Sequence, residues 1–262
     1  MVMEISIDPI DTPSDSISRY NAYTLHADDH RILTVTTNSL QTLSKWLTDL
    51  LKSTAKTNHH PILVGVSAER EIVEYTKRGV DDQPFDILTL CVGSQCLIYH
   101  LDSRDHPYIP RDFRPIKPLR AFFENPSVVA VGMGIDAVAK KLARDHGIEI
   151  KNAVDLRALA AKKEEKLDLA RYNLDKVART VLGKHVDVVR PERKVEWYED
   201  YKMRWNRELA VEKVRFATVD AYLCFLVGSE MHDVMIYGGS GTENDEAKAK
   251  NKKNGKKGKK KN

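Results

Sequence analysis

Residues 59–73 read HHPILVGVSAEREIV, which predicts a short buried strand with an acidic residue just past its apolar run. The run over 61–66 is rich in aliphatic side chains, as is typical of a strand that is covered on both faces. Glu69 follows this run, and Ser67 stands two residues before it. Such a strand delivers a carboxylate to one edge of a sheet, and the serine that precedes this acid needs an explanation.

The patterns around this strand predict an α/β fold, a mixed sheet flanked by helices on both faces. Alternating residues predict a hairpin over 21–38, in which one face carries Tyr23, Leu25, Leu33 and Val35. Leucines at helical spacing follow it over 38–52. Further strands are expected at 61–66, 86–92, 95–101, 127–133 and 153–157, and further helices at 115–124, 136–146, 167–183 and 212–235. Early strands followed by alternating helices and strands are typical of this architecture.

The three cysteines of the chain fit a protein that stays in a reducing compartment. Gly93 and Ser94 predict a two-residue turn between two strands, which places Cys91 opposite Cys96. We expect two reduced thiols in the core, because no metal-ligand histidine or second cysteine pair accompanies them. A disulfide between the two strands is the alternative.

The positive charge of the chain is concentrated at its C-terminus. The net charge is +4, but residues 240–262 hold nine lysines and three acidic residues, so the rest of the chain is close to neutral. Residues 238–262 are therefore predicted to be a disordered Lys-rich tail that contacts polyanions or acts as a nuclear-import signal. A tail that only improves solubility is the alternative.

Two further features bear on the cellular location. Residues 1–18 carry four acidic residues and no Lys or Arg, the opposite of a secretory or organellar presequence, and are expected to be a flexible N-terminus. No apolar run reaches the roughly 18 residues that a membrane-spanning helix needs. We therefore expect no membrane contact and a location in the nucleus, the cytoplasm or both.

Several segments together carry a resemblance to a known family. They are VGMGIDAVAKKLARDHGIEIKNAVDLRALA at 131–160, LDKVARTVLG at 174–183, the Trp and Leu of 205–209, and VEKVRFATVDAYLCF at 211–225. Their succession resembles the 3′-5′ exonuclease domain of the Werner-syndrome type, a member of the ribonuclease H-like superfamily.

This resemblance covers about residues 59–235, the motif-bearing core. The hairpin and helix over 19–55 are similar to those of plant members of the family. We therefore expect one exonuclease-like domain over 19–237, between the flexible N-terminus and the Lys-rich tail.

The resemblance implies an active site of four acids and a tyrosine that binds two divalent metals, Mg²⁺ or Mn²⁺. Glu69 and Asp220 match two of the acids. Ser67 and Val138 stand where the family has its other two acids, and Phe216 stands where it has the tyrosine. Two carboxylates can hold one cation weakly, but they cannot easily assemble a pair of metals.

Asp136 precedes the substituted position Val138 by two residues, and we expect it to be the N-cap of its helix, with its carboxylate turned away from the site. We interpret the whole pattern as a nucleic-acid-binding protein of exonuclease type whose hydrolytic activity is lost or greatly reduced. One alternative is an active metal-dependent 3′-5′ exonuclease, and another is a protein-interaction module. The segment 190–205 mixes aromatic and basic residues, and it is expected either to stack bases and hold phosphates or to form a solvated amphipathic helix.

Overall fold

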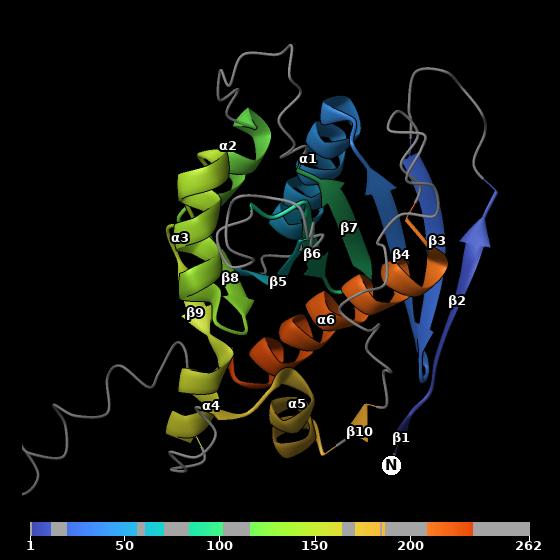
Figure 1. Cartoon of the computed structure of the whole chain (residues 1–262), viewed down its shortest axis with the longest axis vertical. Coiled ribbons are helices and arrows are strands. Elements are labelled where there is room, and N and C mark those ends of the chain that lie inside the picture. The colour runs from blue at the N-terminus through green and yellow to red at the C-terminus, as the bar shows by residue number, and fades with distance from the viewer. Residues whose placement is uncertain are drawn as a thin grey trace, which may run out of the picture.

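The computed structural model describes residues 2–11, 20–56, 61–70, 84–101, 116–163, 171–183, 185–186 and 209–232. Within this part an eight-stranded sheet has the order β2-β3-β4-β7-β6-β5-β8-β9 (Figure 1). Its strands are β2 (Ile5–Ile10), β3 (Tyr20–Ala27), β4 (His30–Thr37), β5 (Ile62–Glu69), β6 (Ile87–Val92), β7 (Gln95–His100), β8 (Val128–Gly132) and β9 (Ala153–Asp155). Two short strands, β1 (Val2–Met3) and β10 (His185–Val186), pair separately.

The sheet is mixed, as predicted. Strand β3 runs antiparallel to its neighbours β2 and β4, and β6 runs antiparallel to its neighbours β7 and β5. Strand β4 lies parallel to β7, and β8 lies parallel to both β5 and β9. The C-terminal ends of β5 and β8 therefore meet at the same edge of the sheet.

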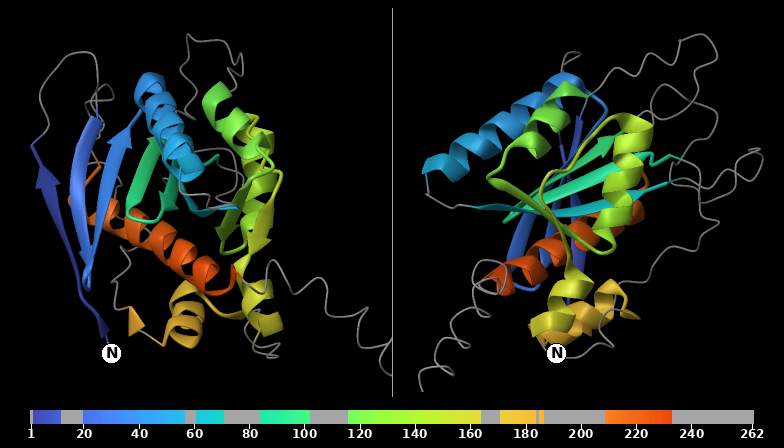
Figure 2. Two further views of the ribbon diagram at one scale, coloured as in Figure 1. Left: turned by 180° about the vertical axis from the view of Figure 1, so that it is seen from behind. Right: turned by 90° about the vertical axis from the view of Figure 1, so that its left-hand side faces the viewer.

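Helices cover both faces of this sheet (Figures 1 and 2). One face packs against α1 (Leu40–Lys56), α2 (Lys117–Glu124) and α3 (Ile135–His146). The other face packs against α6 (Val211–Glu230), with α4 (Leu156–Lys163) and α5 (Leu174–Leu182) beside it. The predicted α/β architecture with helices on both faces is confirmed.

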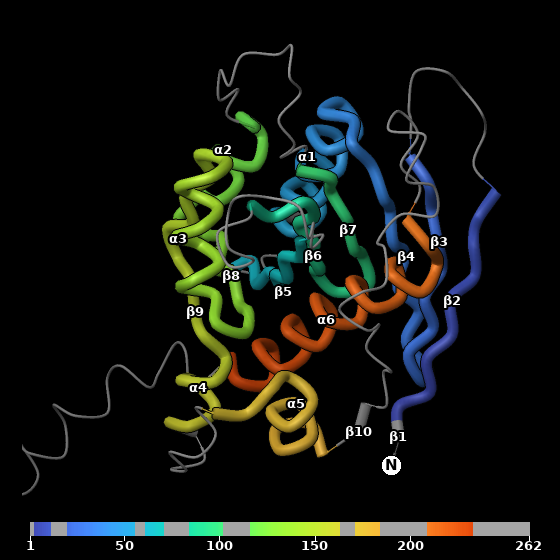
Figure 3. Tube along the Cα trace, viewed as in Figure 1, coloured from blue at the N-terminus to red at the C-terminus, as the bar shows by residue number. Residues whose placement is uncertain are grey.

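Helix α6 crosses the strands obliquely and comes very close to the centre of β5 (Figure 3). A Cβ atom on Gly65 would lie 2.0 Å from the carbonyl oxygen of Ala221 and 2.6 Å from the backbone nitrogen of Phe225. Only a residue without a side chain allows this approach. The glycine in the middle of the apolar run of β5 therefore sets the distance between β5 and α6.

The N-terminus corrects one expectation. The sequence pattern predicts a flexible segment over 1–18, but residues 2–10 contain β1 and β2. Met3 is buried, and Ile5 and Ile7 pack partly buried against the core, while the residues between them face outward. This alternation, together with pairing along β3, orders the segment. The expected domain boundaries at residues 18 and 237 stay a prediction.

Hairpin β3–β4 lies where it is predicted, but its apolar side chains do not share one face. Two residues connect the strands, and this turn pairs Leu33 with Thr24. Since paired residues share a face, Leu33 and Val35 lie on the opposite side of the sheet from Tyr23 and Leu25. Leu33 is 45% exposed.

The cysteine prediction is confirmed. Cys91 and Cys96 are paired in the ladder between β6 and β7, on either side of the turn at Gly93 and Ser94. Both thiols are free and buried, as is Cys224.

Three predictions fall outside the described residues. They are the Lys-rich tail over 238–262, the aromatic and basic segment over 190–205, and residues 167–170 of the helix predicted over 167–183. The predicted start of that helix is wrong, because α5 begins at Leu174, where the side chain of Asn173 caps it by accepting from the backbone N–H of Lys176. In the ranges that are described, no helix has both the length and the apolar character needed to cross a membrane.

Candidate functional site

Strand β5 brings Ser67 and Glu69 to the face of the sheet that packs against α6. Gly65 touches α6, and residues at alternate positions of a strand point to the same face, so Ser67 and Glu69 also face this helix. Both are partly buried. Their partners on β6 are Thr89 and Ile87, respectively. The predicted spacing of the serine and the acid thus places them together beside one helix.

Helix α6 supplies Phe216 and Asp220, which lie one turn apart and therefore share one face of the helix. Asp220 is partly buried and directly precedes Ala221, whose carbonyl oxygen is the atom closest to Gly65. Glu69 and Asp220 are thus carried by two elements in direct contact. Phe216 is only 6% exposed and packs in an apolar cluster with Tyr23, Ile87, Ile98, Leu209, Val214 and Ala217.

Val138 is carried by a third element, in the first half of α3. This helix begins just after β8, at the sheet edge where β5 also ends. The side chain of Val138 is partly buried and packs against the apolar cluster that α1, α2 and α3 form on the other face of the sheet. The structure therefore gives Val138 an apolar environment, and a valine cannot bind a metal.

Asp136 does not cap this helix, so that expectation is wrong. The N-cap of α3 is Gly134, whose φ of 63° is in the left-handed region, and no side chain caps the helix. Asp136 lies in the first turn and is exposed. A carboxylate in the first turn interacts favourably with the helix dipole, which gives Asp136 a structural role without a capping hydrogen bond.

Sequence reasoning missed Lys213, which lies on the same face of α6 as Phe216 and Asp220. This side chain is 2% exposed. Burial lowers the pKa of its ammonium group from the ordinary value, and the negative charge of Glu69 acts in the opposite direction. A lysine at this helical spacing from the family motif, in a helix that is apolar on most sides, is the signal that could have revealed it.

The side chains at the positions that the resemblance assigns to the site offer few ligands for a divalent metal. They offer two carboxylates, one hydroxyl, a valine and a phenyl ring, and Lys213 adds a positive charge. In the part of the chain that the structure describes, no group of three or more His, Cys, Asp or Glu side chains could hold a metal ion. Hard cations prefer several carboxylate oxygens, and among these side chains only Glu69 and Asp220 offer them.

Thr89 adds a detail next to Ser67. Its side chain is fully buried, and its Oγ1 has no hydrogen-bond partner in the described ranges. Because Thr89 and Ser67 are direct neighbours across the ladder, their side chains lie on the same face of the sheet, about 5 Å apart at Cβ. A carboxylate in place of Ser67 would give this hydroxyl an acceptor.

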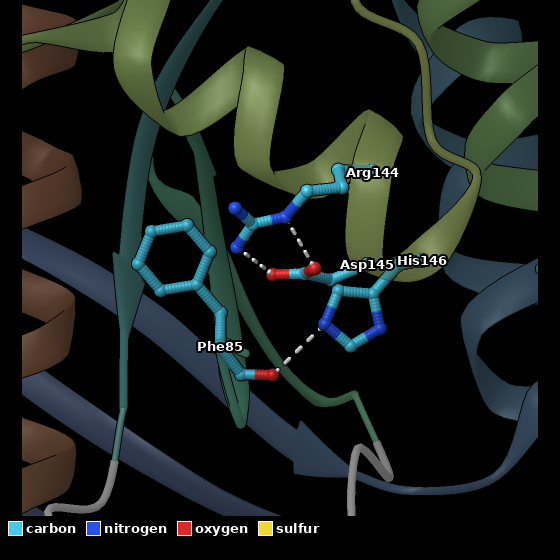
Figure 4. A network of polar contacts seen from close by, with 4 residues as sticks. All are labelled: Phe85, Arg144, Asp145 and His146. Carbon is cyan, nitrogen blue, oxygen red and sulfur yellow. Dashed lines mark hydrogen bonds and ion pairs between the residues drawn. The ribbon is translucent and has the colours of Figure 1, made fainter. Parts of the chain in front are cut away.

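A second group of polar side chains lies at the C-terminal end of α3 (Figure 4). Nε2 of His146 donates to the carbonyl oxygen of Phe85 at 3.0 Å, and Arg144 forms an ion pair with Asp145, with Nε 2.7 Å from Oδ1. Burial lowers the pKa of His146. Phe85 lies two residues before Ile87, the partner of Glu69, so this contact ties α3 to the start of β6 near the candidate site.

Comparisons with known proteins agree with the motifs. A family model described as 3′-5′ exonuclease matches residues 47–236. The bifunctional 3′-5′ exonuclease/ATP-dependent helicase WRN of Mus musculus is 27% identical over 143 residues, which make up 54% of this chain. The match spans only 9% of the length of that protein.

Two solved structures are also similar. The complex of Trypanosoma brucei RNase D with GMP has a TM-score of 0.54 at 12% sequence identity, and the match covers 76% of this chain and 56% of that chain. The EXD2 exonuclease domain soaked in Mn has a TM-score of 0.38 at 19% identity, covering 81% of this chain and 97% of that chain. The likeness to RNase D concerns the fold, which is the one that the motifs predict.

Proposed function

Since the chain belongs to the 3′-5′ exonuclease family, we propose that it binds nucleic acid but hydrolyses it very slowly or not at all. The observation that carries this proposal is the content of the site formed by β5 and α6. These two elements present the carboxylates of Glu69 and Asp220, while Ser67 and Phe216 occupy the other matched positions. Family chemistry uses two divalent cations, and two carboxylates cannot balance their four positive charges.

The expected effect on metal binding follows from electrostatics. At an effective dielectric constant near 20, a pair of unit charges 4 Å apart is worth about 4 kcal/mol. Ser67 and Val138 each remove one negative charge from the set that the family uses. The neutral hydroxyl of Ser67 is a weak ligand, and Val138 is none. Any bound metal, Mg²⁺ or Mn²⁺, is therefore expected to bind weakly, through Glu69 and Asp220.

Phe216 weakens catalysis in a second way. In the family the matching tyrosine hydroxyl helps to orient the attacking water, and a phenyl ring has no hydrogen-bonding group. The ring of Phe216 packs instead in the apolar cluster with Val214 and Ala217. This packing is consistent with a site that holds its fold without catalysis.

The proposed partner is DNA or RNA. The Lys-rich tail over 238–262 is proposed to add contacts with phosphates, and such contacts weaken as salt neutralises the backbone charge. A nuclear or cytoplasmic location, or both, belongs to the same proposal. The helicase activity in the name of the mouse relative does not, because the match spans 9% of that protein.

A second candidate is an active metal-dependent 3′-5′ exonuclease. The retention of Glu69 and Asp220 on two elements that pack against each other favours it. This candidate needs either one metal held by these two carboxylates or a further acid from outside the described residues.

The test is an exonuclease assay with the full chain on single-stranded and recessed DNA and RNA labelled at the 5′ end, in Mg²⁺ or Mn²⁺. We expect the wild type to shorten the substrate no faster than Glu69→Gln. The triple variant Ser67→Asp/Val138→Asp/Phe216→Tyr, in which Thr89 can donate to the new carboxylate at position 67, should bind Mn²⁺ more tightly than the wild type by calorimetry.

The outcomes separate the candidates. Metal-dependent shortening of the 3′ end by the wild type, abolished in Glu69→Gln, would establish the active exonuclease. An inert wild type that binds oligonucleotides with an affinity that falls as salt rises supports the proposal. Absence of oligonucleotide binding at low salt would refute it and favour a protein-interaction module.

A further inference from the structure

Lys213 is among the largest side chains that the described structure buries almost completely. Its neighbours on α6, Val214, Phe216 and Ala217, belong to an apolar cluster. Lysine is rarely buried to this extent unless its ammonium group is paired, because removing the charge from water costs much free energy. The carboxylate that acts on this ammonium is that of Glu69.

The position of Lys213 on α6 relates it directly to the candidate site. It precedes Phe216 by three residues and Asp220 by seven, so all three lie on one face of the helix. Glu69 reaches the same helix from β5. The ammonium is therefore a positive charge that interacts with the first retained acid, on the face of β5 that packs against α6.

We propose that Lys213 is an internal cation that neutralises Glu69 in place of a metal ion. This inference rests on the proposed function and deepens it, because it gives the carboxylate of Glu69 a counter-charge from within the chain. An ammonium group has three N–H donors and no acceptor, so it can satisfy a carboxylate but cannot be a metal ligand. Its charge also repels a divalent cation at the same carboxylate.

An alternative account is that Lys213 only stabilises the fold. Both accounts expect a change in stability when Lys213 is replaced, and they differ in what happens to metal binding. If Lys213 holds the place of a cation, its removal takes a counter-charge away from Glu69, and a divalent ion gains from binding there. If Lys213 acts on stability alone, the affinity for divalent ions stays at the wild-type level.

The experiment measures binding of Mn²⁺ alone to the full-length chain, by calorimetry and by the effect of Mn²⁺ on Tm. Lys213→Met keeps the length of the side chain and removes its charge. We expect this variant to bind Mn²⁺ at least about tenfold more tightly than the wild type, which is about 1.4 kcal/mol. At the same Mn²⁺ concentration the Tm of Lys213→Met should rise more than that of the wild type.

Two control variants sharpen the result. Lys140→Met removes the same charge from an exposed position on α3 and should leave Mn²⁺ binding unchanged. Lys213→Met/Glu69→Gln removes the carboxylate as well and should abolish the gain. The inference would be overturned if Lys213→Met bound Mn²⁺ no more tightly than the wild type, or no more tightly than Lys140→Met.

A second measurement covers the case in which Lys213→Met fails to fold. The double variant Lys213→Met/Glu69→Gln buries no uncompensated charge, so we expect it to be more stable to urea than Lys213→Met alone. A double variant that is no more stable would also refute the pairing. If the wild type proves to be an active exonuclease, both proposals fail, whereas an inert wild type with no gain in Lys213→Met refutes only this inference.

Discussion

Replacing Gly65 by alanine should force β5 and α6 apart at the centre of the domain. The new Cβ would lie 2.0 Å from the carbonyl oxygen of Ala221, and ordinary contact begins at 3.4 Å. The helix backbone would therefore have to retreat by about 1.4 Å at this point. Both atoms closest to the new Cβ, the Ala221 oxygen and the Phe225 nitrogen, belong to the backbone of α6, so no side-chain rotation can relieve the clash.

We expect this substitution to lower the free energy of unfolding by about 3 kcal/mol, at the upper end of the cost of overpacking a core. For a domain of this size that corresponds to a fall in Tm of about 6–12 °C. The assay is urea denaturation followed by circular dichroism, with a thermal melt in parallel. The same retreat of α6 would change the position of Asp220 and Lys213 relative to Glu69.

The matched control is Gly228→Ala, in the same helix. There the nearest atoms are side-chain carbons of Val131 and Leu63, at 2.9 Å and 3.2 Å, which can shift. Alanine also favours the helix over glycine by about 1 kcal/mol, so the net change should stay within about 1 kcal/mol of the wild type. A Gly65→Ala protein as stable as Gly228→Ala would refute the argument that the backbone contact sets the distance between β5 and α6.

Three further predictions concern buried polar groups. Thr218→Val should cost about 1–3 kcal/mol, because it leaves the buried hydroxyl of Thr34 without the partner that now lies 3.2 Å away, and adding Thr34→Val should recover part of this loss in urea denaturation. The free energy of unfolding of the wild type should fall as the pH drops below 6.5 towards the lowered pKa of native His146, because in this range the unfolded chain binds the proton and the native chain does not. This pH dependence is at most about 1.4 kcal/mol per pH unit for one group. The variant His146→Gln should lack it. All three cysteines should resist maleimide labelling until the protein unfolds, because all three thiols are buried. Burial, together with the hydrogen bond to Cys96, also raises the pKa of Cys91, which disfavours its reactive thiolate. Labelling that is faster than unfolding, measured by mass spectrometry, would contradict this prediction.

Much of the fold could be predicted because its signals are local. The periods of strand and helix placed β5, the β6–β7 hairpin, α3 and α6 within a few residues of their observed bounds. The chemical content of the site is local too, since the sequence states that a serine, a valine and a phenylalanine occupy three of the family positions. No tertiary contact can give these three side chains a carboxylate.

Two features of the sheet could not be read in this way. Whether Leu33 faces the core depends on the register that the turn between β3 and β4 imposes, and a shift of one residue reverses every side chain. Residues 5–10 form the strand β2 because they pair with residues of β3 that lie at least 12 positions further along the chain. Local patterns restrict such choices, and only the assembled sheet selects one.

The sequence by itself determined most of the core strands and helices and which side chains stand at the positions that the resemblance assigns to the site, because backbone periodicity and residue identity need no distant partner. Only the tertiary structure decided that Lys213 is buried beside Glu69, 144 residues away along the chain, and that Gly65 is the point of contact between β5 and α6. The physical reason is that burial and electrostatic pairing are properties of packed neighbours, and β5 and α6, far apart in the sequence, become neighbours only in the folded domain.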